Sequence, residues 1–145
     1  MTTSTATASP SGLGLDDRLA RNARALIRID AVLTTLAGLE MVLLPALFVR
    51  LHGLGAMPLL GVRLLGLEWL LFGIWLLGLW SRPLTRGMAR FAIAVLGLNA
   101  LFLLVAPLAF GLDYSPLGWA LTIGVVSFMD LICLSWWQVW RHRAA

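Results

Sequence analysis

Four long apolar segments divide this chain, and they restrict its fold more than any other feature of the sequence. The segments cover about residues 27–49, 59–80, 89–110 and 117–139. Each is close to the roughly 20 residues that a helix needs to cross the hydrocarbon core of a bilayer. Because lipid cannot satisfy exposed peptide groups, each segment is expected to be helical. The sequence therefore predicts an all-α membrane protein with four transmembrane helices.

The composition favours a membrane protein over a soluble one. Hydrophobic residues make up 60% of the 145 residues and charged residues 12%, against about 45–50% and about 25% in soluble domains. So few charges could not cover the surface of a soluble domain of this length. Short connections make consecutive helices antiparallel neighbours. We therefore expect a single four-helix antiparallel bundle.

The expected helices define the domain organisation. It consists of a flexible polar tail with a basic juxtamembrane segment at 1–24, a transmembrane domain at 25–140, and a short basic tail at 141–145. The start of the chain lacks the basic and apolar regions of a signal peptide. Gly38 is followed by Pro58 after 20 residues, and Gly97 by Pro116 after 19. This similarity leaves open whether the two helical hairpins are an internal repeat.

The positions of the arginines predict the orientation in the membrane. The chain has 11 arginines and no lysine. Most lie in the N-terminal flank, the connection between the second and third segments, and the C-terminus: Arg18, Arg21, Arg24, Arg28, Arg82, Arg86, Arg90, Arg141 and Arg143. The other two connections hold only Arg50. The positive-inside rule therefore places both termini in the cytoplasm. Arginines at helix ends do not form the basic face that nucleic-acid binding needs.

Polar side chains within the apolar segments are the candidate functional residues. Each segment has one near its middle: Glu40, Glu68, Asn99 and Asp130. With a rise of 1.5 Å per residue, all lie within roughly 5 Å of the membrane midplane. An ionised side chain there costs about 2.5–3.5 kcal/mol. The four side chains are therefore expected to converge inside the bundle, as a site for protons or cations, as a polar spot in an apolar cavity, or as structural hydrogen bonds.

Five further residues have narrower interpretations. Ser127, one turn from Asp130, is a secondary candidate. Arg63, near the outer end of the second segment, is another, because it either extends to the outer headgroups or pairs with Glu40. Asp30 lies near several arginines and is expected in a surface ion pair. Pro45 is expected to kink the first helix, and Pro107 is expected to kink the third.

The sequence shows no pattern of metal ligands or catalytic groups. The two histidines, His52 and His142, are far apart, and the single cysteine is Cys133. HxxxH, CxxC and HExxH spacings are absent, so we predict neither a metal nor a cofactor. The catalytic residues stay unknown, and a function other than catalysis is favoured.

Three functions are therefore open, in this order of preference. The first is a small carrier subunit coupled to protons or cations. The second is a non-catalytic assembly subunit of a membrane complex, and the third is an intramembrane acid–base enzyme acting on an apolar substrate. Four helices form a thin pathway, so a carrier would need a homo-oligomer or a larger complex. The expected partners are thus the lipid bilayer and other membrane subunits.

Short motifs support this layout by resemblance. The chain has Arg28-Ile29-Asp30 before a Gly-Leu helix, an arginine in the second helix, and Asn99-Ala100-Leu101-Phe102 in the third. In these features it resembles small, mostly uncharacterised bacterial membrane proteins of DoxX-like size and layout. The resemblance covers about residues 25–140 and implies four helices in a bacterial inner membrane. It assigns no site residue. In size and in its mid-membrane Glu40 the chain also resembles small multidrug transporters, but their motifs are missing and this chain is longer.

Overall fold

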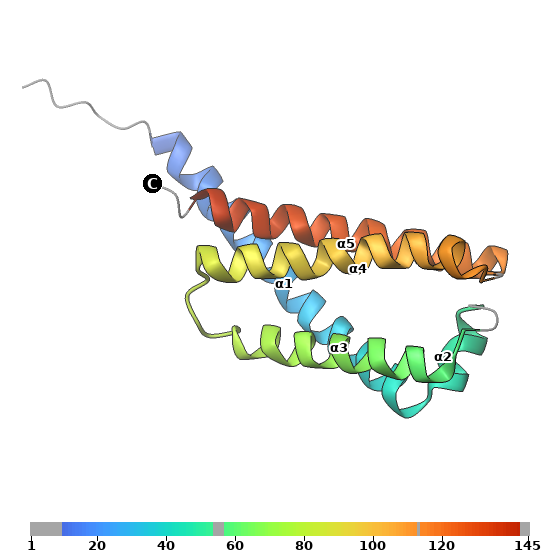
Figure 1. The fold of residues 1–145 in the computed structure, drawn as a ribbon. Coiled ribbons are helices and arrows are strands. Elements are labelled where there is room, and N and C mark those ends of the chain that lie inside the picture. The colour runs from blue at the N-terminus through green and yellow to red at the C-terminus, as the bar shows by residue number, and fades with distance from the viewer. Residues whose placement is uncertain (1–9, 54–56, 113, 143–145) are drawn as a thin grey trace, which may run out of the picture.

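The computed structural model describes residues 10–53, 57–112 and 114–142. Over these residues the chain forms five α-helices and no β-strand (Figure 1). The helices are α1 (Pro10–Leu43), α2 (Pro45–Leu51), α3 (Leu59–Gly78), α4 (Arg86–Phe110) and α5 (Pro116–His142). The predicted all-α class is therefore confirmed.

Three of the helices, α3, α4 and α5, are each long and apolar enough to cross a membrane. They match the predicted segments 59–80, 89–110 and 117–139 to within three residues at each end. The helices α1 and α2 together form a fourth candidate span, but a bend of 114° separates them.

This bend corrects the prediction of one helix over 27–49. Pro45 has no N–H to donate to the carbonyl of Met41, and its ring favours the first turn of a new helix. The last backbone bond of α1 runs from Leu44 N to Glu40 O over 2.7 Å, and α2 begins at Pro45. By contrast, Pro107 lies inside α4, which continues to Phe110.

The other end of α1 extends well before the predicted span. This helix is continuous from Pro10 to Leu43, so it includes the predicted basic juxtamembrane residues as well as most of the first span, and the domain boundary at residue 24 stays a prediction. Residues 1–9 of the expected tail lie outside the described residues. A proline at the first helical position fits, because its missing N–H would have no intrahelical partner there.

Glycines bring α1 and α3 into close contact. A Cβ added to Gly66 would lie 3.0 Å from the carbonyl oxygen of Gly38, and one added to Gly73 would lie 2.7 Å from the backbone N of Thr35. Real Cβ atoms essentially never lie under 3.0 Å from another atom, and a distance of 3.0 Å is tighter than nine in ten real contacts. The absence of a Cβ therefore allows the two backbones to pack directly against each other.

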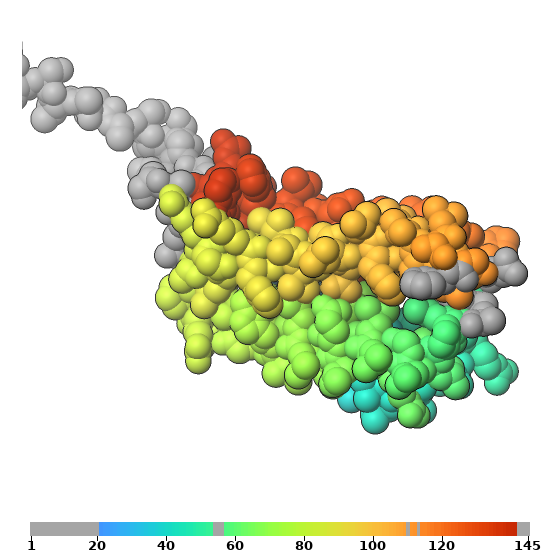
Figure 2. Space-filling model, viewed as in Figure 1, coloured from blue at the N-terminus to red at the C-terminus, as the bar shows by residue number. Residues whose placement is uncertain are grey.

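The remaining packing leaves α3 and α4 apart. Helix α4 packs along α5, and α5 packs along α1, around a core that includes Ile132 and Trp136. Although α3 and α4 are consecutive, no Cα of α3 lies within 8 Å of a Cα of α4. Figure 1 shows this separation, and Figure 2 shows that side chains of α3 (green) and α4 (yellow) meet in it.

Candidate functional site

A chain of hydrogen bonds joins α3 to α4 across their wide separation. The indole Nε1–H of Trp69 donates to Oδ1 of Asn99 over 2.8 Å, and Nδ2 of Asn99 donates to Oε1 of Glu68 over 3.0 Å. Nδ2 also donates to the carbonyl oxygen of Val95 over 3.0 Å. Because an indole N–H can only donate, it fixes the amide orientation that turns Nδ2 towards the carboxyl group.

The local sequence explains how two α3 residues reach the same amide. Glu68 and Trp69 are adjacent, and successive helical residues are about 100° apart around the axis. Both side chains are half-buried, whereas Asn99 is 9% exposed. The buried amide thus has all its principal hydrogen-bonding groups satisfied, while within the described part of the chain only one oxygen of Glu68 receives a hydrogen bond.

Glu68 lies where two shallow grooves meet on the α3–α4 face. One groove includes Leu64, Leu98 and Asn99, and the other includes Leu71 and the aromatic pair described next. Apart from Glu68 and Asn99, glycine and hydrophobic residues line both grooves. The carboxyl group is therefore a single acidic contact on an apolar face.

Aromatic side chains connect α3 to α4 beyond Glu68. The Trp75 and Phe91 rings meet edge to face with centroids 5.0 Å apart, and Phe72 stacks near Trp75 at 5.6 Å. These contacts join the two helices through side chains where their backbones are apart. They form one end of the groove that Glu68 lines.

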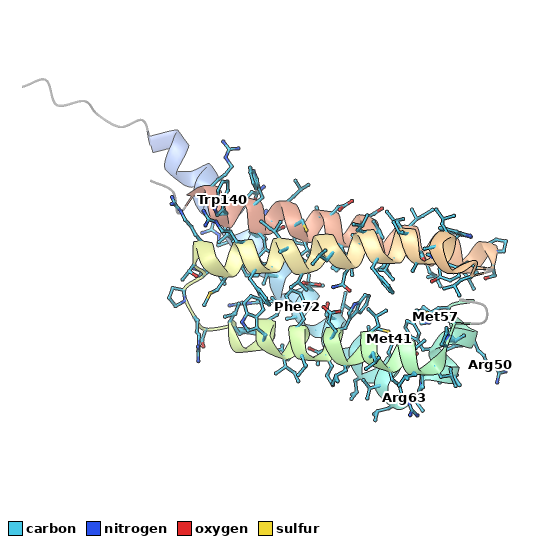
Figure 3. All side chains as sticks on the ribbon, viewed as in Figure 1. Met41, Arg50, Met57, Arg63, Phe72 and Trp140 are labelled. Carbon is cyan, nitrogen blue, oxygen red and sulfur yellow. The ribbon has the colours of Figure 1, made fainter. Side chains whose placement is uncertain are left out.

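An apolar cavity of about 110 Å³ lies behind Trp69. Its lining comes from all five helices and includes Met41, Phe48, Leu103 and Val125. Figure 3 shows Met41, and also Met57 of the lining, in the half of the molecule that contains α2. A cavity of about 150 Å³ binds benzene in another protein, so this space suits part of a small apolar molecule.

Few polar groups line this cavity, namely His52, Tyr114 and Thr122 besides Trp69. Nδ1 of His52 lies 2.9 Å from the carbonyl oxygen of Phe48. Burial raises the pKa of the Tyr114 phenol above its usual range, so its hydroxyl stays protonated. The ring of Trp69 thus lines the cavity, while its N–H belongs to the hydrogen bonds of the Glu68 grooves.

Two of the four predicted midplane residues are brought together and two are not. Glu68 and Asn99 are hydrogen-bonded to each other. Asp130 is exposed on α5, and Ser127 is exposed one turn before it. The buried stripe of α5 follows Thr122 and Met129, so the next residue after Met129 is rotated about 100° away from it. The expected convergence therefore does not extend to Asp130.

The two remaining candidates lie on α1 and α3. Glu40 is half-buried and lines neither the cavity nor the grooves. Arg63 and Arg50 are both exposed. Figure 3 shows both at the periphery of the molecule near α2. Of the two interpretations of Arg63, this position favours extension to the headgroups over a pair with Glu40.

The expected surface ion pair of Asp30 is wrong. Its side chain is 2% exposed, and its Oδ1 accepts a hydrogen bond of 2.9 Å from the Thr34 hydroxyl. Its other oxygen is buried without a partner, as is Nε1 of Trp136. This carboxyl group is therefore turned into the protein and forms no ion pair with a described arginine.

Sequence reasoning missed Trp69. A signal was present, because a tryptophan next to a mid-membrane Glu68 needs an acceptor for its N–H when buried.

Among the described residues, no group of three His, Cys, Asp or Glu side chains is placed to hold a metal ion. No protein-family model, curated protein or solved structure matches this chain.

Proposed function

We propose that this chain is a four-span membrane protein, with α1 and α2 as one span, that acts as a carrier subunit for an apolar small molecule with a basic group. The observation that carries the proposal is the position of Glu68. It lines grooves on the α3–α4 face, and through Asn99 it is linked to Trp69, which lines the internal cavity.

The lining chemistry supports this choice of ligand. Molecules dissolved in lipid would reach the α3–α4 grooves laterally, and hydrophobic residues line most of this path. A carboxylate in hydrocarbon is unfavourable until it binds a proton or a cation. If the basic group of the ligand and a proton compete for Glu68, binding of one releases the other. That competition is the coupling we propose.

The setting that we propose is a bacterial inner membrane, with both termini in the cytoplasm and the helices in an antiparallel bundle. The arginines at the two termini and between α3 and α4 support this orientation. A homo-oligomer or a larger complex fits this role, because four helices alone form a thin pathway.

Flux through reconstituted protein tests the proposal. Purified protein in liposomes should take up a fluorescent apolar amine in response to a proton gradient. Glu68→Gln should abolish this uptake and leave thermal unfolding unchanged, because glutamine keeps the hydrogen bond with Asn99 but cannot exchange a proton. Asp130→Asn and Glu40→Gln are matched controls, since each removes a carboxyl group outside the grooves.

The controls also define failure of the proposal. Uptake should persist in Asp130→Asn and Glu40→Gln. Equal loss in all three variants would mean that the effect is one of overall charge. Absence of uptake by the wild-type protein, with stability lost only in Glu68→Leu, would favour a structural role for the Glu68–Asn99 pair.

A second candidate function rests on Asp130. This residue is exposed near the middle of α5, where a charge facing lipid costs about 2.5–3.5 kcal/mol. A neighbouring membrane subunit that covers Asp130 and Ser127 would remove this cost. The second candidate is therefore a non-catalytic assembly subunit. Cross-linking from a cysteine placed at Ser127 in native membranes should capture another protein if this function is correct.

A further inference from the structure

Three arginines surround a small pocket at the end of the molecule opposite α2. Arg24 and Arg28 are one turn apart on α1, and Arg82 lies in the connection between α3 and α4. Residues i and i+4 of a helix share one face. The pocket encloses about 20 Å³. Figure 1 shows that the α3–α4 connection and the end of α5 lie at this same end.

The pocket has an apolar floor and an aromatic edge. Ile27, Leu76, Leu79 and Leu84 are each at most 6% exposed and form the floor. Trp80 is 48% exposed at the edge, with the guanidinium carbon of Arg28 5.5 Å from its ring centroid. This cation–π contact restricts the position of the Arg28 side chain.

Among the residues that the structure describes, no acidic side chain lines this pocket. The carboxyl group nearest in sequence, that of Asp30, is 2% exposed and accepts its hydrogen bond from Thr34. The side chains of Arg24, Arg28 and Arg82 thus line the pocket without a carboxylate among its described lining residues. Guanidinium groups have only donors, and they match the oxygens of phosphate in pairs.

We propose that this pocket binds a phosphate group, and that the group is the headgroup phosphate of an anionic phospholipid. The enclosed space would seat phosphate oxygens and not a whole molecule. The remainder of the ligand would lie outside, against Trp80 and the hydrophobic ends of α1 and α3. Arginine and tryptophan at the end of apolar helices are at the depth of lipid headgroups. This site is independent of Glu68.

Lipid-dependent stability tests this site. The full chain, purified in a neutral detergent, is titrated with phosphatidylglycerol, with phosphatidylcholine, or with inorganic phosphate, and its thermal unfolding is followed. We expect a concentration-dependent rise in the unfolding temperature with phosphatidylglycerol only. A rise with inorganic phosphate alone would show that the site binds a soluble anion and would overturn the assignment to lipid.

Matched arginine pairs separate the pocket from overall charge. The double variant R24Q/R28Q should weaken phosphatidylglycerol binding roughly fivefold for each arginine removed. The control R86Q/R90Q removes another i, i+4 pair, which is exposed near the same end but does not line the pocket. Equal weakening in both double variants would overturn the proposal.

A single variant at Arg82 is an alternative to the double variant. If R24Q/R28Q does not fold, Arg82→Gln takes its place, because Arg82 lies in a connection rather than in a helix. It should weaken phosphatidylglycerol binding roughly fivefold, whereas Arg86→Gln should not. Unchanged binding in Arg82→Gln would count against the pocket.

Discussion

The indole N–H of Trp69 on α3 donates a hydrogen bond of 2.8 Å to Oδ1 of Asn99 on α4. This bond decides which end of the Asn99 amide meets Glu68, because an indole N–H can only donate a hydrogen bond and so selects the amide oxygen. A change at Trp69 should therefore alter the surroundings of the Glu68 carboxyl group without touching that residue. The same bond is one of the few polar links between two helices whose backbones are apart.

The first prediction concerns Trp69→Phe. The phenyl ring keeps most of the cavity wall but removes the donor, so Oδ1 of the buried Asn99 loses its partner. We expect a loss of about 1 kcal/mol in the free energy of unfolding and weaker amine uptake. Trp137→Phe, at a tryptophan that is 46% exposed, should change neither. An unaffected Trp69→Phe protein would mean that the bond does not hold the amide.

The second prediction is energetic coupling between Glu68 and Asn99. Glu68→Leu and Asn99→Leu each break the same bond, so the double variant should be less destabilised than the sum of the single variants. Coupling energies of interhelical hydrogen bonds in membranes are about 0.6 kcal/mol on average and reach about 1.7 kcal/mol. Unfolding in detergent measures this coupling. Asp130→Leu combined with Asn99→Leu is the control, and its effects should add.

Most of the helical fold follows from the sequence. The helices α3, α4 and α5 are predictable because each is an apolar run of membrane-spanning length. The bend at Pro45 is only partly predictable. A proline predicts a break, but the angle of 114° depends on how α2 packs against α3. The separation of α3 from α4 is also not predictable, because a short connection fixes where two helices start and not how far apart they run.

The depth of the candidate residues along their helices is predictable from the sequence, but the direction in which each side chain points around its helix is not. Residue number sets how far along a helix each polar group lies, so Glu68 and Asn99 are found at one depth. Which face of the helix is buried depends on the neighbouring helices. In α5 the buried face follows Met129 instead of Asp130, and this one-residue difference turns the carboxyl group outward. The buried face of α1 is equally unpredictable from the sequence. The arginines near Asp30 favoured an exposed ion pair, whereas Asp30 lies on the buried face.

The third prediction tests the close packing of α1 against α3. In Gly38→Ala the new Cβ would lie 2.8 Å from the carbonyl oxygen of Gly66, so the helices must separate. We expect a loss of about 1–3 kcal/mol in stability. Gly97→Ala is the opposite control, since a Cβ there meets nothing within 4 Å and alanine favours a helix by about 1 kcal/mol. Equal destabilisation in both variants would contradict this packing.

The fourth prediction concerns the buried carboxyl group of Asp30. Asp30→Asn keeps an oxygen for the Thr34 hydroxyl, and the neutral amide costs less to bury than a carboxylate. Its unfolding temperature should equal or exceed that of the wild type. Asp30→Leu should instead lower it, because the Thr34 donor loses its acceptor. Strong destabilisation by Asp30→Asn, matched by the same loss in Arg28→Gln, would restore the ion-pair interpretation.

The final prediction fixes the orientation of the chain. Reporter fusions after Arg86 and Ala145 should report the cytoplasm, and fusions after Gly55 and Asp113 the opposite side, because the arginines gather at the first two sites. Consecutive sites along the chain are separated by one candidate span each, α3, α4 and α5 in turn, so the four readings should alternate. The bent α1–α2 pair makes the Gly55 fusion the most informative. If it reports the cytoplasm and Arg86 the opposite side, with the N-terminus in the cytoplasm, α3 crosses the membrane and the bent pair is a re-entrant segment. An outside reading for Arg86 would reverse the scheme, and the arginine pocket would then face the other leaflet.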